Sequence, residues 1–178
     1  MIALPGYQVQ EQLYESVHSC TLRARRLKDD LPVILKLLKE AHPSPRLLRR
    51  CRQEYEFATE LAGRPGIIRV LGLETLGDSL ALVVEDFGGE SLKSLLAQRS
   101  FPLREALEIG QGIAACLAEV HASRIIHKDI NPANVLYNPL TRQVRLIDFG
   151  ISTRLPRENL GFESPEKLEG TLAYLSPE

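Results

Sequence analysis

Three short segments of the sequence concentrate side chains that can carry chemistry. They are His127-Lys-Asp-Ile-Asn-Pro-Ala-Asn134, Asp148-Phe-Gly150, and the stretch from Gly170 to Glu178. Carboxylates and amides are groups that proteins use to hold hard cations and to accept protons. Each segment alone has an ordinary structural explanation, because Asp and Asn favour turns and a single histidine is more often part of a core. Their combination in one chain is what raises a catalytic hypothesis.

Hydrophobic periodicity singles out two further charged residues in the first third of the chain. Residues 33–38 read as a β-strand on which Lys36 stands among aliphatic residues. The following stretch reads as a helix with Ser44 as its N-cap and Gly63 at its stop. Glu54 falls within the apolar stripe of that helix, and a buried carboxylate needs a partner. We therefore expect one lysine and one glutamate to face inward.

The remaining pattern changes from strands to helices along the chain. Residues 67–73 and 80–84 read as two strands around a turn, and the second is apolar throughout, as a central strand is. The glycines within residues 85–89 mark a hinge or domain boundary. Because the strand-rich part comes first, the predicted class is α+β in two lobes. The later elements are helices over residues 91–99 and 103–120 and short apolar runs at 125–126, 135–137 and 144–147. The predicted packing stripe of the long helix comprises Leu103, Ala106, Leu107, Gly110, Ile113, Ala114, Leu117 and Val120.

Together and in this order, the segments resemble the protein kinase signature set of strand lysine, helix glutamate, H-R-D-L-x-x-x-N, D-F-G and A-P-E. The resemblance covers the chain from about Tyr7 to its last residue. It implies a bilobal kinase-like fold, with a sheet and one helix in the N-lobe and a mostly helical, incomplete C-lobe. The implied boundaries are N-lobe 1–84, hinge 85–90 and partial C-lobe 91–178. Residues 127–134 and 169–178 look most like the kinase module of large bacterial signalling proteins, which implies further modules in the parent chain.

The resemblance implies a role for each matched residue. Asp129 would accept the proton of, or orient, a substrate hydroxyl, as phosphoryl transfer to a protein Ser or Thr requires. Lys36 would contact the α and β phosphates of ATP, held by an ion pair with Glu54. Asn134 and Asp148 would hold Mg²⁺ through oxygen atoms, which suit a hard cation.

Further residues are implied to position the substrate loop or to bind the nucleotide. Thr171 matches the family's G-T-x-x-Y and would favour Ser or Thr substrates over Tyr. Glu90 would meet the ribose hydroxyls, although a solvated residue at a helix start explains it equally well. The nucleotide set also includes Val84 as gatekeeper, Glu85 and Phe87 on the linker, and Ser16, Ser19 and Leu136.

Several positions depart from the family pattern. The three glycines of the phosphate loop are replaced by Tyr14, Ser16 and Ser19, so the backbone approaches phosphates less freely. Asn131 replaces a lysine that meets the γ phosphate, which removes a positive charge. Two milder departures are Ile34 in place of an alanine above adenine and Lys128 in place of the catalytic-loop arginine.

These departures leave two alternatives to an active protein kinase. A pseudokinase or regulatory nucleotide-binding module is favoured by the missing glycines and by Asn131, and is opposed by the intact Asp129 and Asp148. A small-molecule phosphotransferase is opposed by residues 170–178, which match the loop that docks a protein substrate.

Composition narrows the partners and the compartment. Lys and Arg number 22 against 23 Asp and Glu, so the formal net charge is −1 and offers no general field for nucleic acid or anionic membranes. Cys20, Cys51 and Cys116 form no CxxC pair, which favours a reducing compartment over a disulfide or zinc framework. The opening residues lack a signal-peptide pattern, and no apolar run reaches the ~18 residues of a membrane helix. We therefore expect a cytoplasmic protein without nucleic-acid or membrane partners.

The length of 178 residues by itself suits one or two small domains. The resemblance changes this expectation, because Glu178 aligns with the last residue of A-P-E and the family's substrate-binding lobe continues beyond that point. We expect the helix over 103–120 to lack packing partners and to expose apolar surface. We also expect that this end marks a truncated gene or the edge of a contig, and that the fragment is unstable or inactive alone.

Overall fold

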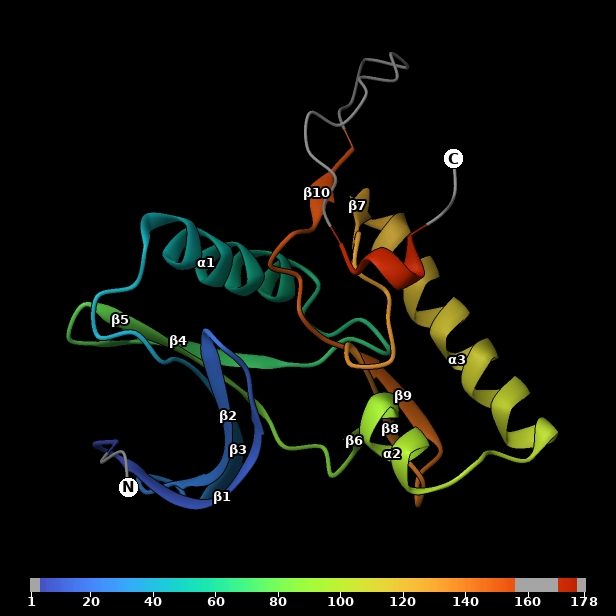
Figure 1. Ribbon diagram of the computed structural model, residues 1–178, viewed down its shortest axis with the longest axis horizontal. Helices are drawn as coiled ribbons and strands as arrows, with labels where there is room; N and C mark the ends of the chain where they lie inside the picture. The colour runs from blue at the N-terminus through green and yellow to red at the C-terminus, as the bar shows by residue number, and fades with distance from the viewer. Residues whose placement is uncertain (1–3, 156–169, 176–178) are drawn as a thin grey trace. The chain divides into compact units, whose positions relative to one another are not determined.

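The computed structural model describes residues 4–155 and 170–175 (Figure 1). The chain divides into two compact units, Met1–Ala62 with Ile68–Gly88, and Gly63–Ile67 with Gly89–Glu178. The whole Ser-Pro-Glu sequence that aligns with A-P-E, residues 176–178, lies outside the described residues.

A five-stranded antiparallel sheet forms the first unit. Its strands in chain order are β1 (Tyr7–Glu15), β2 (Ser19–Arg26), β3 (Leu31–Leu38), β4 (Val70–Leu76) and β5 (Ser79–Glu85). The spatial order is β1-β2-β3-β5-β4, which confirms the apolar β5 as an inner strand. Tyr7 of β1 donates its hydroxyl hydrogen to the carboxylate of Glu74 in β4. The two edge strands of the sheet are therefore joined, and the sheet curls around its core.

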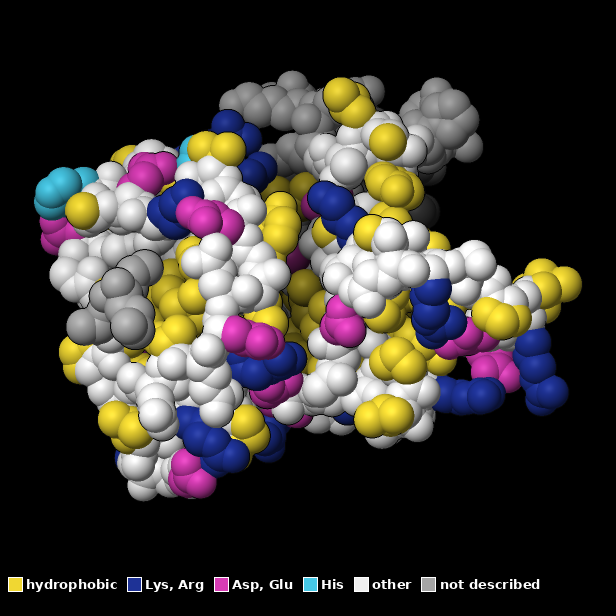
Figure 2. Space-filling view, turned by 60° about the horizontal axis from the view of Figure 1, so that its bottom comes forward, with side chains coloured by type: hydrophobic (Ala, Val, Ile, Leu, Met, Phe, Trp, Pro, Cys, Tyr) yellow, Lys and Arg dark blue, Asp and Glu magenta, His cyan; other side chains and the backbone are white. Residues whose placement is uncertain are grey.

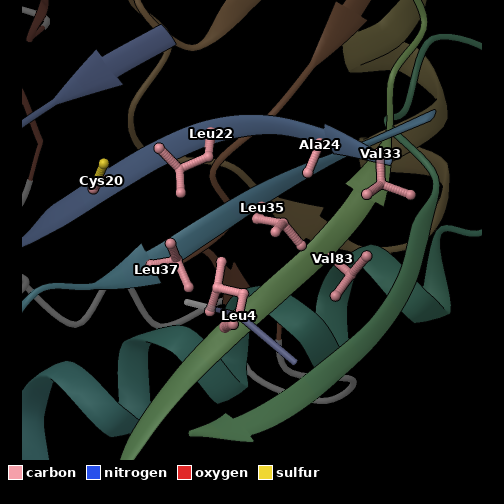
Figure 3. Close-up of a cluster of buried hydrophobic side chains, with 9 residues drawn as sticks. Leu4, Cys20, Leu22, Ala24, Val33, Leu35, Leu37 and Val83 are labelled. Atoms are coloured by element: carbon pink, nitrogen blue, oxygen red, sulfur yellow. The ribbon is translucent and has the colours of Figure 1, made fainter. Parts of the chain in front are cut away.

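Strand alternation places the core on one face of this sheet. In β3, Val33, Leu35 and Leu37 are buried while the residues between them are half-buried, which confirms the predicted period of two. Burying an aliphatic side chain of this size stabilises the fold by about 1.5–3 kcal/mol. Figure 3 shows these side chains gathered with those of β2 and β5. The cluster consists of Leu4, Cys20, Leu22, Ala24, Val33, Leu35, Leu37, Ala81 and Val83.

One helix, α1 (Pro45–Glu60), lies against β4 and β5 (Figure 1). Its start is as predicted, because the Ser44 side chain accepts a hydrogen bond from the Leu47 amide and a proline opens the helix. Glu54 is buried on its inner face between Cys51 and Ala58, as the periodicity predicted. The helix ends earlier than expected, at Glu60, and the predicted stop Gly63 follows with a φ of 81°.

The first strand of the predicted pair 67–73 and 80–84 starts later than predicted. β4 begins at Val70, while Ile67 forms an isolated parallel bridge with Leu146. The cause lies in Gly66, whose φ is 78° and where a Cβ atom would stand 2.1 Å from the Cys116 sulfur. Only glycine fits this close approach. Residues Gly63–Ile67 therefore pack as part of the second unit, and β4 begins only after them.

In its described residues, the second unit combines two α-helices with short strands (Figure 1). The helices are α2 (Leu92–Gln98) and α3 (Leu103–Ala122), with a 3₁₀ turn, η1 (Leu172–Tyr174). One sheet has the order β6-β8-β9, and β7 pairs with β10. The strand bounds are β6 (Glu90–Ser91), β7 (Ile125–Ile126), β8 (Val135–Asn138), β9 (Gln143–Leu146) and β10 (Thr153–Arg154).

The predicted packing face of α3 is partly wrong. Leu103 and Leu107 are 77% and 65% exposed, whereas Ile109, Cys116 and Val120 are buried. The close packing occurs at Gly112, where a Cβ atom would lie 2.7 Å from Val144, whereas a Cβ atom on the predicted Gly110 would meet nothing within 4 Å. The expected exposed apolar surface on this helix is present in the described residues.

Charges are mixed over the surface. On the face shown in Figure 2, acidic and basic side chains lie beside one another, interrupted by scattered hydrophobic groups. This agrees with the net charge of −1. All three cysteines are buried and none forms a disulfide. Within the described residues, no helix has both the length and the hydropathy needed to cross a bilayer.

Candidate functional site

The two charged residues singled out by periodicity meet in the first unit. Lys36 Nζ lies 2.7 Å from Glu54 Oε2 and 3.0 Å from Oε1. The Glu54 side chain is only 10% exposed and that of Lys36 29%, so the carboxylate is buried with its counter-charge. This satisfies the requirement that a buried charge be paired and hydrogen-bonded.

Strand register defines the surroundings of Lys36. Directly opposed residues of antiparallel strands share a face, and Lys36 is opposed by Thr21 on one side and Leu82 on the other. Ile34 is opposed by Val84 in the same way. Lys36, Ile34 and Val84 therefore lie on the face opposite the core. Thr21 belongs to this face and was missed in the sequence, where only the β2–β3 register could have indicated it.

The second unit centres on the carboxylate of Asp129. Its Oδ1 accepts hydrogen bonds from Thr171 Oγ1 (2.7 Å), Thr171 N (3.0 Å) and Asn131 Nδ2 (3.0 Å). Its Oδ2 accepts from Asn134 Nδ2 at 3.0 Å. Four donors hold this carboxylate in one orientation, and two of them come from a residue 42 positions away. Asp129, Asn134 and Thr171, all predicted site residues, are thus brought together.

His127 fixes the backbone around Asp129. The ring is buried, its Nε2 lies 2.9 Å from the Ile147 carbonyl oxygen, and its Nδ1 accepts from the Asp129 amide at 3.3 Å. This pattern assigns the proton to Nε2. Burial lowers the pKa of His127, so the ring is neutral at neutral pH. The Ser152 hydroxyl donates to the His127 carbonyl, and the Phe149 ring lies 4.7 Å away. His127 therefore has the structural role of a satisfied core histidine, and joins two of the predicted segments.

Comparison with known proteins decides the family. The family model of the protein kinase domain matches residues 7–178. The chain belongs to the protein kinase family. Among similar proteins, the Ser/Thr kinase pkn2 of Myxococcus xanthus is 33% identical over 82% of this chain, and PrkC of Bacillus subtilis is 31% identical over 84%. Ribosomal protein S6 kinase alpha-2 of mouse is 29% identical over 86%.

These relatives are much longer than the chain. It spans 18% of pkn2, 23% of PrkC and 21% of the mouse kinase. The matched part is a kinase domain with an antiparallel sheet and few helices, in agreement with the predicted α+β kinase-like class.

The two residues predicted to hold a metal ion, Asn134 and Asp148, have a chemistry that suits this role. The side-chain nitrogen of Asn134 donates hydrogen bonds to the backbone oxygen of Asp129 (2.9 Å) and to Asp129 Oδ2 (3.0 Å). The side-chain oxygen of Asn134 is therefore the atom that suits a cation. The backbone N–H of Ile147, next to Asp148, donates to the Asn134 carbonyl at 3.1 Å. Asp148 has a φ of 67°, a left-handed conformation that is uncommon for residues other than glycine. An amide and a carboxylate oxygen fit Mg²⁺, which usually takes few protein ligands and completes its shell with phosphate and water.

The loop between β1 and β2, which is the predicted phosphate loop, lacks glycine but has a defined turn. Ser16 Oγ accepts hydrogen bonds from the amides of His18 (3.3 Å) and Ser19 (3.0 Å). The Lys39 amide donates to the His18 carbonyl at 3.0 Å, and Lys39 Nζ lies 2.5 Å from the Glu15 carboxylate. The serines therefore stabilise the turn from within, and Lys39 ties it to the end of β3.

The remaining predicted nucleotide residues lie on separate elements. Glu85 ends β5, and its carboxylate accepts from the Arg69 amide at 2.9 Å. Glu90 on β6 accepts from Ser94 and Gln98 of α2, each at 3.2 Å, which is the helix-start arrangement given above as its alternative explanation. Phe87 on the linker and Leu136, between two buried residues of β8, are both half-buried.

Proposed function

We propose that this chain is the catalytic domain of an ATP- and Mg²⁺-dependent Ser/Thr protein kinase acting in bacterial signalling. Its membership of the kinase family supports the reaction class, and the names of its relatives support Ser/Thr specificity. The observation that carries the proposal is the contact between Thr171 and Asp129, at 2.7 Å, because it fixes the proposed base against the loop that receives the substrate.

Asp129 is the proposed proton acceptor. Its Oδ1 is occupied by three donors, whereas among the described residues its Oδ2 has a single donor, Asn134. Oδ2 is therefore the atom that orients the substrate hydroxyl and takes its proton. As the proton moves to Oδ2, the hydroxyl oxygen bonds to the γ-phosphorus and the bond to the ADP oxygen breaks. No charge-relay through His127 is needed, since its ring is neutral and faces Ile147.

Charge neutralisation is assigned to both units. Lys36, oriented by Glu54, is proposed to bind the α and β phosphates. Asn134 and Asp148 are proposed to hold Mg²⁺, which when bound neutralises charge on the phosphates. Because Asn131 is neutral and bonded to Asp129, this chain relies more on Lys36 and the cation than a kinase with a lysine there.

Adenine and ribose recognition is proposed for the sheet face that carries Lys36. Val84 lies on this face, the backbone of the linker residues Glu85 and Phe87 is proposed to meet adenine, and Ser16 and Ser19 are proposed to meet the phosphates. Leu136 and Glu90 remain predictions for the same ligand. We also propose a cytoplasmic parent protein that contains further modules.

The test is transfer of labelled γ-phosphate to a generic protein substrate by the full-length protein. Asp129→Ala is expected to abolish labelling, while Asp30→Ala, at an exposed carboxylate between β2 and β3, leaves it intact. Labelling that survives Asp129→Ala contradicts the mechanism.

A second candidate, a pseudokinase, is favoured by one observation: the loop amides of His18 and Ser19 are already bonded to Ser16. This occupies donors that the family uses over the phosphates. Nucleotide binding that persists without any phosphate transfer by the wild-type protein selects this alternative.

A further inference from the structure

Arg23 of β2 makes a contact that the kinase signature does not assign. Its Nε donates to Asp86 Oδ2 at 2.7 Å, and its Nη1 donates to Glu11 of β1. Asp86 is the residue directly after β5, 63 positions from Arg23. Its side chain is only 13% exposed, against 52% for Glu11, so the pair with Asp86 is the better protected of the two.

Asp86 in turn holds the linker backbone. Its second oxygen, Oδ1, accepts a hydrogen bond from the Gly88 amide at 3.0 Å. Gly88 has a φ of 73°, a conformation that glycine adopts without strain. The Asp86 carboxylate therefore links the Arg23 side chain to the backbone turn at Gly88.

Arg23 also stands on the functional face of the sheet. It is opposed by Ile34 in β3, and Ile34 is opposed by Val84 in β5. Arg23 thus shares the face that carries Lys36 and reaches from it to the linker. Its guanidinium can serve Glu11 and Asp86 at the same time because its donors are arranged in a planar fork.

We propose that Arg23 is a positioning residue for the nucleotide, which through Asp86 holds the backbone of residues 85–88 in the conformation that receives adenine. This rests on the proposed ATP-dependent function, since it assigns a further residue to that site. Arg23 touches no reacting atom, so its loss is expected to weaken nucleotide binding and to leave the chemical step unchanged.

The test compares Arg23→Ala with Arg25→Ala in the full-length protein. Arg25 is a matched control, because it lies on the same strand and pairs with Asp30 at 2.6 Å, away from the linker. Arg23→Ala is expected to raise the KM for ATP about fivefold with kcat within about twofold, as loss of one partly exposed hydrogen bond that acts only through the linker predicts. Arg23→Lys is expected to fall between wild type and Arg23→Ala, and Arg25→Ala to match wild type.

A second readout is independent of ATP. Hydrogen exchange at the Gly88 amide in nucleotide-free protein is expected to accelerate about fivefold in Arg23→Ala and to stay unchanged in Arg25→Ala. Unchanged exchange in Arg23→Ala overturns the link itself, whether or not the protein is a kinase. Faster exchange with an unchanged KM overturns the positioning role.

If Arg23→Ala does not fold, Asp86→Asn gives the same comparison, because it keeps the side-chain shape and removes the charge. A wild type that neither binds nor uses ATP refutes the proposed function and with it the assignment to adenine, and the exchange result still decides the link.

Discussion

Lys36 of β3 and Glu54 of α1 form a two-pronged ion pair, with both carboxylate oxygens within 3.0 Å of the ammonium nitrogen. The pair joins a strand to a helix across 18 positions. Removing charges from water is costly, and the two groups compensate each other only together. The pair therefore affects both stability and the proposed phosphate contact, and variants can separate the two effects.

Lys36→Met is expected to lower the free energy of unfolding by about 2 kcal/mol, because it removes the ammonium group that pairs with the buried Glu54 carboxylate. The expected loss is moderate because the lysine side chain is partly exposed. Adding Glu54→Leu is expected to recover most of that loss, whereas kinase activity stays absent in both variants. Urea unfolding and phosphate transfer measure the two properties. A surface control is Lys39→Met, whose partner Glu15 is exposed, and which should lower the free energy of unfolding much less than Lys36→Met does. Equal destabilisation by the single and double variants contradicts the expected compensation.

The buried His127 predicts a pH dependence of stability. Burial lowers its pKa in the folded state below its unfolded value of about 6.5, so the unfolded chain binds a proton that the folded chain does not. Stability is therefore complete above pH ~6.5 and decreases as the pH falls below that value. Unfolding measured between pH 5 and 8 is expected to show this slope in wild type and to lose it in His127→Gln. His121→Gln, at an exposed histidine near the end of α3, should keep it. If His127→Gln leaves the slope of stability against pH unchanged, the titrating group is a residue other than His127.

A variant at Asn131 can separate an effect on stability from an effect on catalysis. Its amide nitrogen donates to Asp129 Oδ1 (3.0 Å) and Thr171 Oγ1 (3.2 Å), and its oxygen accepts from the Ala133 amide. Asn138 is a similar buried asparagine, whose oxygen caps the turn after β8 at the Leu140 amide. Each changed to Ala is expected to lose about 1–2 kcal/mol of stability.

Only Asn131→Ala is expected to lower kcat, by about tenfold with little change in KM, because Asp129 loses one of its orienting donors. Denaturant unfolding and steady-state kinetics test both variants. A kcat equally reduced by Asn138→Ala means that the effect is merely structural.

Local patterns in the sequence predicted much of this domain. The alternation in β3, the Ser44 cap and the inward position of Glu54 follow from neighbours within a few residues, and the structure confirms each. The inward position of Glu54 predicted only that its carboxylate needs a partner, and the kinase resemblance implied that this partner is Lys36.

Long-range contacts account for what the sequence did not predict. The start of β4 is set by the approach of Gly66 to Cys116, 50 positions later in the chain. The contact of Arg23 with Asp86 depends on how three strands pair, and no local pattern indicates it. The buried face of α3 was mispredicted because apolar residues occur on several of its faces, and contact with β9 selects among them.

Two glycines of α3 give a prediction about how this helix packs on β9. A Cβ atom at Gly112 would stand 2.7 Å from a methyl carbon of Val144, whereas at Gly110 it would meet nothing within 4 Å. Gly110→Ala is expected to stabilise the fold by about 0.5–1 kcal/mol, the usual gain of Ala over Gly inside a helix. Gly112→Ala receives the same helical gain but must displace Val144 from a packed interface, which costs about 1–3 kcal/mol and gives a net loss. Thermal unfolding of the two variants beside wild type measures both signs. Stabilisation by both substitutions would show that α3 does not pack on β9 through Gly112.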